Sequence, residues 1–490
     1  MLFNSFSFLI FLAGIVLAER LTPQRYRWGL LLVASFIFYG LWNAGALTWL
    51  ALVTLVAYGT GLALERYPSV ARRILAAALV ADLGILFLLK YFNFAAEQLH
   101  KLLARTGWLD PSWTVPHIGW LLPAGLSFYT LSAASYMIDV YRRQLPAERH
   151  LGKLALFLAF FPKILAGPIE RATRFLPQLA AGHSRDPERL AEGARLVLWG
   201  LFKKVVIADR LHPFVEAAFG QPMLATPVQL LVGIYFYAFQ IYADFSGYTD
   251  IATGAAKMLG FDFAPNFRRP YLAQSTVEFW GKQRWHISLS TWFRDYLYIP
   301  MGGNRVGWAR RYLNTMVVFL ASGIWHAGLV GGGMSWSYLL WGALNGVYQW
   351  ISMATSPLWK ALGNRLPQIR DHWAWKACRI VWTFHLITFA WIFFRAASVS
   401  DAFFIISKIA SNLSRLPMLV RFYDVQPEFV LSVALIALLM VVEVADEARG
   451  VWKKFQSQPV YVRWTVYYAL LLLLVVLGQW GLAEFIYMQF

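Results

Sequence analysis

Two histidines stand out because they lie among residues that are otherwise strongly apolar. His286 belongs to the stretch 279–304, which mixes polar and apolar residues. His326 directly follows a run, 315–325, that carries no charged residue. Ionisable side chains are costly at membrane depth unless the protein interior solvates them. A neutral imidazole costs less to bury than a charged one and can accept a proton, so both histidines are candidates for general-base catalysis.

The neighbours of the two histidines suggest how a site could be built. On a helix, Ser290 and Arg294 would continue the face of His286 at four-residue spacing. Small residues around His326 would let a substrate approach its ring closely. A structural histidine bonded to a backbone carbonyl would fit either position as well, and we take His326 as the stronger catalytic candidate. The candidates for lining the site or stabilising an oxyanion are Trp285, Ser290, Arg294, Asp295 and Trp325.

Two carboxylates form a second polar group. Asp244 and Asp250 flank a Phe-Ser-Gly-Tyr segment that follows an apolar run. They could pair with Arg268 or Arg269 and stabilise a bend, or they could transfer protons; ion pairing is the expected role. No spacing of His, Asp or Glu in the sequence resembles a metal site, so no metal and no bound cofactor is expected.

Composition indicates the kind of molecule that must hold these residues. The chain has 490 residues, of which 59% are hydrophobic and 14% charged, whereas a soluble protein carries about 25% charged residues. Apolar runs close to the length of a membrane crossing occur at 2–19, 28–43, 46–64, 74–93, 118–140, 194–212, 224–243, 313–330, 335–355, 379–395, 428–446 and 464–483. The run 152–168, broken by two prolines, favours a re-entrant segment.

We therefore expect an all-α polytopic membrane protein with 11 to 13 membrane-embedded helices. Short interfacial and re-entrant helices would surround a central chamber, with residues 244–330 as its wall. No second soluble domain is expected, so 1–490 form one unit. Its parts would be N-terminal helices (1–153), a catalytic core (154–350) and C-terminal helices (351–490).

Basic residues predict the orientation of the front half. The loops after the first, third and fifth runs are rich in arginine, and the loops between them are not. The positive-inside rule places the arginine-rich loops in the cytoplasm and the N-terminus outside. The net charge of +18 suits attraction to anionic membrane lipids, or a site for an anionic ligand. Nucleic-acid binding is not expected, because the basic residues are spread over many loops.

Six segments resemble motifs of the membrane-bound O-acyltransferase family. The resemblance points to its bacterial branch that O-acetylates exported polysaccharides, alginate included. It covers most of the chain and is carried by 160–170 (FFPKILAGPIE), 242–250 (YADFSGYTD), 266–271 (NFRRPY), 286–304, 322–326 (SGIWH) and 485–490 (FIYMQF). Together these motifs are highly specific, although each alone would be a modest signal.

The resemblance implies an activity and a location. His326 occupies the position expected for the family's catalytic histidine, and His286 that of its second functional histidine. The donor would be acetyl-CoA or another acyl thioester entering from the cytoplasm. The acceptor would be a hydroxyl group outside, and His286 or Ser290 would orient the donor or stabilise the oxyanion. Such proteins work in the bacterial inner membrane with a periplasmic acetyltransferase of the SGNH hydrolase type and with exopolysaccharide machinery.

Two functions from other classes fit part of the pattern. A transporter for an anionic lipid or saccharide would also have many spans and buried polar groups, but the sequence shows no internal pseudo-repeat. A structural scaffold of an exopolysaccharide export complex would give no reason to bury His326. An acyltransferase is therefore the preferred hypothesis.

Overall fold

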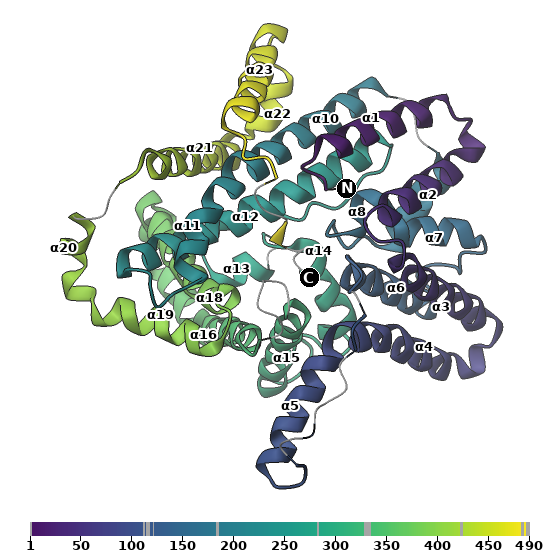
Figure 1. Cartoon of the computed structure of the whole chain (residues 1–490), viewed down its shortest axis with the longest axis horizontal. Helices are drawn as coiled ribbons and strands as arrows, with labels where there is room; N and C mark the ends of the chain where they lie inside the picture. The colour runs from purple at the N-terminus through teal and green to yellow at the C-terminus, as the bar shows by residue number, and fades with distance from the viewer. Residues whose placement is uncertain are drawn as a thin grey trace.

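The structure, a computed structural model, describes residues 2–110, 113, 118–120, 122–182, 186–281, 284–327, 335–421, 425–481 and 485–486. Within these residues the chain is helical and contains no strand (Figure 1). The last four residues of the C-terminal FIYMQF motif lie outside the described residues.

The α-helices of the first half are α1 (Phe6–Leu21), α2 (Gln24–Gly40), α3 (Ala46–Arg66), α4 (Ala71–Leu86), α5 (Phe92–Arg105), α6 (Leu126–Tyr141), α7 (Leu151–Ala159), α8 (Phe161–Ile164), α9 (Ala172–Ala181), α10 (Pro187–Leu201), α11 (Asp209–Phe219) and α12 (Pro227–Met258). Those of the second half are α13 (Thr276–Gly281), α14 (Ile287–Phe293), α15 (Trp308–His326), α16 (Ser337–Arg365), α17 (Pro367–Asp371), α18 (Trp373–Arg395), α19 (Val399–Ser411), α20 (Leu416–Arg421), α21 (Pro427–Arg449), α22 (Val451–Gln456) and α23 (Val460–Leu477).

Several helices are built to cross a membrane. Six stretches of helix in the described residues are long and apolar enough, and a bent pair, 399–411 with 413–420, would make seven. This is fewer than the expected 11 to 13. The runs 2–19, 28–43 and 118–140 form helices of only 16 or 17 residues, whereas a straight crossing needs about 20. The run 194–212 is divided between α10, a π-helix and α11.

The long helix α12 lies at the centre of the molecule and is buried along most of its length (Figure 1). Its start is fixed by a capping box, in which Thr226 and Gln229 bond each other's backbone N–H groups, with Pro227 in the first turn. This arrangement satisfies N–H groups that would otherwise lack partners at the helix start. The helix carries the YADFSGYTD motif into the core.

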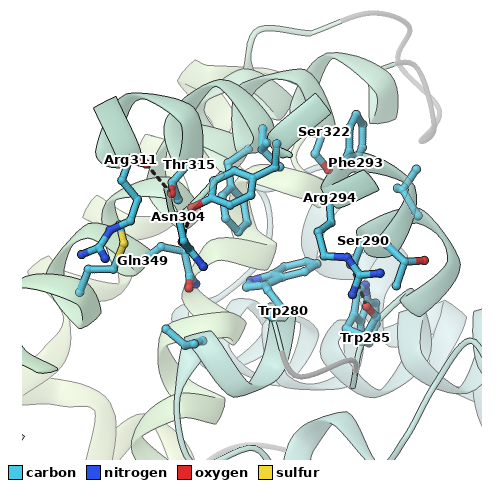
Figure 2. A pocket seen from close by; sticks show the side chains of 18 of the residues that line it. Trp280, Trp285, Ser290, Phe293, Arg294, Asn304, Arg311, Thr315, Ser322 and Gln349 are labelled. Carbon is cyan, nitrogen blue, oxygen red and sulfur yellow. Dashed lines mark hydrogen bonds between the residues drawn. The ribbon is translucent and has the colours of Figure 1, made fainter. Parts of the chain in front are cut away.

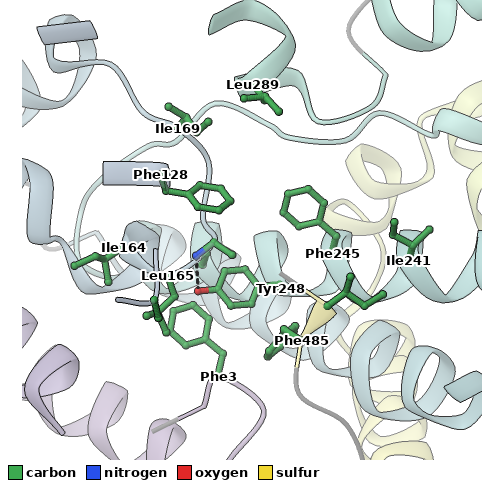
Figure 3. Packing of buried hydrophobic residues seen from close by; sticks show 14 of the residues in the cluster. Phe3, Phe128, Ile164, Leu165, Ile169, Ile241, Phe245, Tyr248, Leu289 and Phe485 are labelled. Carbon is green, nitrogen blue, oxygen red and sulfur yellow. Dashed lines mark hydrogen bonds between the residues drawn. The ribbon is translucent and has the colours of Figure 1, made fainter. Parts of the chain in front are cut away.

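Residues from both ends of the chain meet at α12. The ring of Tyr248 lies 4.7 Å from the ring of Phe3 and 4.6 Å from that of Phe485. Its hydroxyl accepts a hydrogen bond from the backbone N–H of Ala166 at 3.2 Å, and Figure 3 shows this bond within the surrounding apolar cluster. The core is thus assembled from segments far apart in sequence.

Three π-helical segments interrupt the helices of the described chain. They are Phe87–Tyr91, Phe202–Ala208 and Arg294–Tyr298. Each carries ionisable residues, namely Lys90 in the first, Lys203 and Lys204 in the second, and Arg294 and Asp295 in the third. Since a π-turn bulges the helix and is often found at functional sites, these segments direct attention to the polar interior.

Candidate active site

A chamber of about 840 Å³ connects the surface with the two histidines. It is lined by α13, α14, the π-helix 294–298, α15 and α16. Its lining includes the exposed residues Arg294, Asn304 and Pro357 and the buried residues His286 and His326, which are 1% and 3% exposed. Figure 2 shows Arg311, Thr315 and Gln349 on one side and Ser290 and Arg294 on the other.

One face of α15 forms a continuous wall of this chamber. Arg311, Thr315, Ser322 and His326 all line it, and their spacing of four, seven and four residues keeps them on one helical stripe. At 1.5 Å per residue the stripe is about 22 Å long. Segment 244–330 was expected to form the wall, and its part from residue 277 to 326 does so. The opposite wall on α16 was not expected.

Close packing of α15 on α16 fixes the end of the stripe that carries His326. A Cβ atom on Gly323 would lie 2.5 Å from the carbonyl oxygen of Tyr338, and one on Gly342 would lie 2.4 Å from that of Phe319. Only glycine permits such an approach without a shift of the backbone. Gly323, one of the small residues beside His326, therefore serves helix packing.

The hydrogen bond of His326 defines its tautomer. Its Nδ1 lies 2.7 Å from the backbone carbonyl oxygen of Ser322, and a carbonyl oxygen can only accept, so Nδ1 carries the proton. The lone pair of the neutral ring is then on Nε2, which is the nitrogen available for accepting a proton. His385 on α18 makes the same bond to Val381 at 2.7 Å but is exposed. The chamber, rather than the carbonyl bond, distinguishes His326.

His286 has an unusual backbone that a neighbouring asparagine holds in place. It precedes α14 with φ of 41°, a left-handed conformation that is uncommon for a residue with a side chain and that recurs at functional sites. Asn266 accepts hydrogen bonds from the backbone N–H of Ile287 at 2.9 Å through its carbonyl, and from the N–H and Oγ of Ser288 at 3.1 and 3.0 Å through Oδ1. This clamp orients His286.

The two imidazoles face each other across an aromatic enclosure. Their ring centroids are 6.2 Å apart. Trp325 lies 4.7 Å from His326 and 6.0 Å from His286, while Phe245 meets His286 edge to face at 4.7 Å. His286 lies outside the candidate spans, and burial, with a smaller effect of His326, lowers its pKa well below the ordinary value. Its ring is therefore neutral, and a neutral imidazole can still donate one hydrogen bond.

The other site candidates divide into two groups. Trp285, Ser290 and Arg294 line the chamber, whereas Asp295 and Trp325 are absent from its described lining. Trp325 packs behind the histidines, and Asp295 forms ion pairs with Arg171 at 3.5 Å and with Arg294 at 2.8 Å.

The expected pairing of the two carboxylates with Arg268 or Arg269 is wrong. Asp244 pairs with Lys204 at 2.6 Å and Asp250 with Lys203 at 2.7 Å. These lysines belong to the π-helix 202–208, about 40 residues earlier, so local sequence offered no guide to the contact. Arg269 instead pairs with Asp446 and Glu447 on α21, and Arg268 is exposed.

Lys90 contributes to this site and was not among the residues predicted from the sequence. Its ammonium group donates to the carbonyl oxygen of Trp325 at 2.9 Å and lies 3.4 Å from Ser127 Oγ. This hydrogen bond stabilises the last turn of α15, next to His326. A lysine within the apolar run 74–93 was the available signal.

Comparison with known proteins agrees with this geometry. The sequence model of the membrane-bound O-acyltransferase family matches residues 34–398. The chain belongs to this family and is a membrane-bound O-acyltransferase.

Similar proteins extend the match over most of the chain. A probable alginate O-acetylase AlgI of Azotobacter vinelandii is 39% identical over 410 residues, which cover 82% of this chain and 76% of the relative. The corresponding protein of Pseudomonas aeruginosa is 38% identical, with coverage of 82% and 73%. A peptidoglycan O-acetyltransferase of Helicobacter pylori is 32% identical, with coverage of 76% and 71%.

Proposed function

We propose that this protein moves an acetyl or other short acyl group from a cytoplasmic thioester to a hydroxyl acceptor on the opposite side of the membrane, for O-acetylation of an exported polysaccharide. The observation that carries the proposal is the chamber, which joins an arginine-bearing opening to two imidazoles 6.2 Å apart. Relatives named as an alginate O-acetylase and a peptidoglycan O-acetyltransferase support a glycan as the final acceptor.

The geometry supports the following chemistry. The acceptor hydroxyl oxygen attacks the thioester carbonyl carbon while Nε2 of His326 takes the hydroxyl proton; such a base typically contributes about 10²–10⁴-fold. His286, or the hydroxyl of Ser290, donates a hydrogen bond to the oxyanion that forms. The C–S bond then breaks, and the leaving thiolate takes the proton back from His326. The surrounding aromatic rings exclude water, which would otherwise hydrolyse the donor.

The opening of the chamber is proposed to face the cytoplasm. Arg142, in an arginine-rich loop, donates to the backbone carbonyl of Asp295 at 3.2 Å, next to Arg294 at the opening. Under the positive-inside rule this side is cytoplasmic, which puts the N-terminus in the periplasm of a bacterial inner-membrane protein. We further propose that a periplasmic SGNH-type acetyltransferase and the exopolysaccharide machinery receive the acetyl group.

The decisive experiment compares two histidines that make the same local bond. Inverted membrane vesicles containing the protein are given acetyl-CoA with a labelled acetyl group, and label in the polymer or its partner is measured. His326→Ala is expected to lower transfer by about 10²–10⁴-fold while the protein still accumulates. His385→Ala, which removes an exposed ring with the same carbonyl bond, is expected to leave transfer unchanged. Normal transfer by His326→Ala would refute the catalytic assignment.

A further inference from the structure

Two polar groups in the chamber have no hydrogen-bond partner in the described part of the chain. Gln349, on α16, lines the chamber and is 7% exposed, yet its Nε2 makes no hydrogen bond there. Arg311, on α15, also lines the chamber, and its Nε is likewise buried and unbonded. A buried polar group left unsatisfied destabilises the fold, because it gives up its hydrogen bonds to water without replacing them. Their placement is therefore best explained by a ligand.

Other polar residues on α16 show that this is not a general property of the helix. Asn345, one turn before Gln349, donates to the carbonyl of Trp341 at 2.9 Å and accepts from Nε1 of Trp280 at 3.0 Å. Ser352 meets the hydroxyl of Thr276 at 3.2 Å. The described part of the protein provides hydrogen-bond partners for these neighbours but none for Nε2 of Gln349, which is left for a ligand that enters the chamber.

The packing of α16 against α15 determines how far Gln349 lies from His326. Nε1 of Trp350 donates to the carbonyl of Tyr312 at 2.8 Å, and a Cβ on Gly346 would contact the Met316 side chain. Gln349 therefore lies level with residues 312–316, about 15–21 Å before His326 along α15. Because α15 and α16 run antiparallel and side chains lean toward their own N-terminus, the Gln349 amide and the His326 ring approach each other.

These groups match one kind of donor. A glutamine side chain presents both a donor and an acceptor, so it complements an amide, and arginine suits a phosphate. A pantetheine-type arm carries amides between its thioester sulfur and a terminal phosphate. We propose that Gln349 determines donor specificity by binding the amide of this arm that is farther from the sulfur, with Arg311 as the contact for its phosphate. This inference rests on the proposed function, since the thioester must lie at the histidines.

The test measures binding of an uncleavable donor to the purified full-length protein in detergent. The probe is S-acetonylpantetheine, whose thioether cannot be cleaved, and a matched probe has the farther amide replaced by two methylene groups. Calorimetry is expected to show that the wild type binds the amide probe about tenfold more tightly than the matched probe, which is the difference that one hydrogen bond makes. Gln349→Leu should bind both probes equally, at the weaker affinity, and Gln349→Met should do the same. Ser352→Ala should keep the wild-type preference.

The outcomes separate this inference from the proposed function. If Gln349→Leu or Gln349→Met folds and keeps the preference, or if the wild type shows none, the assignment of Gln349 is overturned. The proposed function would still stand if wild-type vesicles transferred acetyl from acetyl-CoA. If wild-type vesicles transferred no acetyl group from any thioester, the proposed function would fail, and the inference would fail with it.

Discussion

The buried interior of this protein contains two polar regions that touch each other but are built differently. In the lysine cluster, Lys204 lies between Asp209 at 2.8 Å and Asp244 at 2.6 Å, and all three side chains are at most 3% exposed. In the histidine chamber, neutral imidazoles and a glutamine whose Nε2 makes no hydrogen bond in the described part of the chain face a cavity. Phe245 joins the two regions, since it follows Asp244 and packs on His286.

The difference leads us to expect a structural role for the lysine cluster and a catalytic one for the histidine chamber. Buried charges that neutralise each other within the protein hold segments together. Removal of one partner destabilises the fold, because the other charge stays buried without compensation. Polar groups that face a cavity are kept for a ligand, so their loss should affect reaction rather than folding. Each of the following substitutions tests this division.

The largest expected effect on folding is that of Lys204→Met. It leaves Asp209 and Asp244 buried without their cation, which should cost about 3–5 kcal/mol of the free energy of unfolding. The amount of folded protein in membranes and its thermal unfolding in detergent are the measurements. Lys203→Met should cost less, because the carboxylate of its partner Asp250 is 28% exposed. A Lys204→Met protein with wild-type stability but no activity would assign the cluster to catalysis instead.

A smaller effect, and on activity, is expected for Asn266→Ala. The change removes the Oδ1 that binds both the N–H and the Oγ of Ser288 and leaves only the backbone bond to Ile287, so His286 is held less firmly in its left-handed conformation. Loss of these bonds, at about 1–3 kcal/mol, should lower acetyl transfer by about 10–100-fold in the vesicle assay. Ser288→Ala, which removes one of the two bonds, should have a milder effect. Unchanged transfer would show that the clamp does not position His286.

The smallest effect is expected for Asp295→Asn. Its ion pairs with Arg171 and Arg294 are partly exposed, with its own side chain at 32%, and such pairs contribute about 0–1 kcal/mol. Transfer and stability should both stay close to wild type. A tenfold loss of transfer in a stably folded protein would place Asp295 in the catalytic site, as the sequence had suggested.

Where the structure places several candidate residues could be predicted from the sequence, because the signals are local. Four-residue spacing grouped His286 with Ser290 and Arg294, and all three line the chamber, although His286 precedes α14 and does not lie on it. The uncharged run before His326 indicated its burial. The helical class also follows from composition. These features depend on patterns within one helix or one apolar run, which a single sequence contains.

The partners of those residues were harder to predict, because they come from distant segments. Lys204 and Asp244 are 40 residues apart, and Lys90 and Trp325 are 235 apart. Nothing in α16 alone indicates that Gln349 faces a cavity and Asn345 does not. The number of crossing helices also differed, since three apolar runs form helices of only 16 or 17 residues and a π-helix divides the run 194–212.

The meeting of both ends of the chain at Tyr248 has a consequence for how the protein is made. Phe3, among the first residues synthesised, and Phe485, more than 480 residues later, pack on the same ring. The N–H of Ile486 also donates to Asp244 at 2.8 Å, beside the wall of the chamber. During membrane insertion the packing around Tyr248 and Asp244 therefore stays incomplete until residue 486 has been synthesised. A ribosome that stalls in the last helices would therefore leave a chain inserted in the bilayer but without a sealed core.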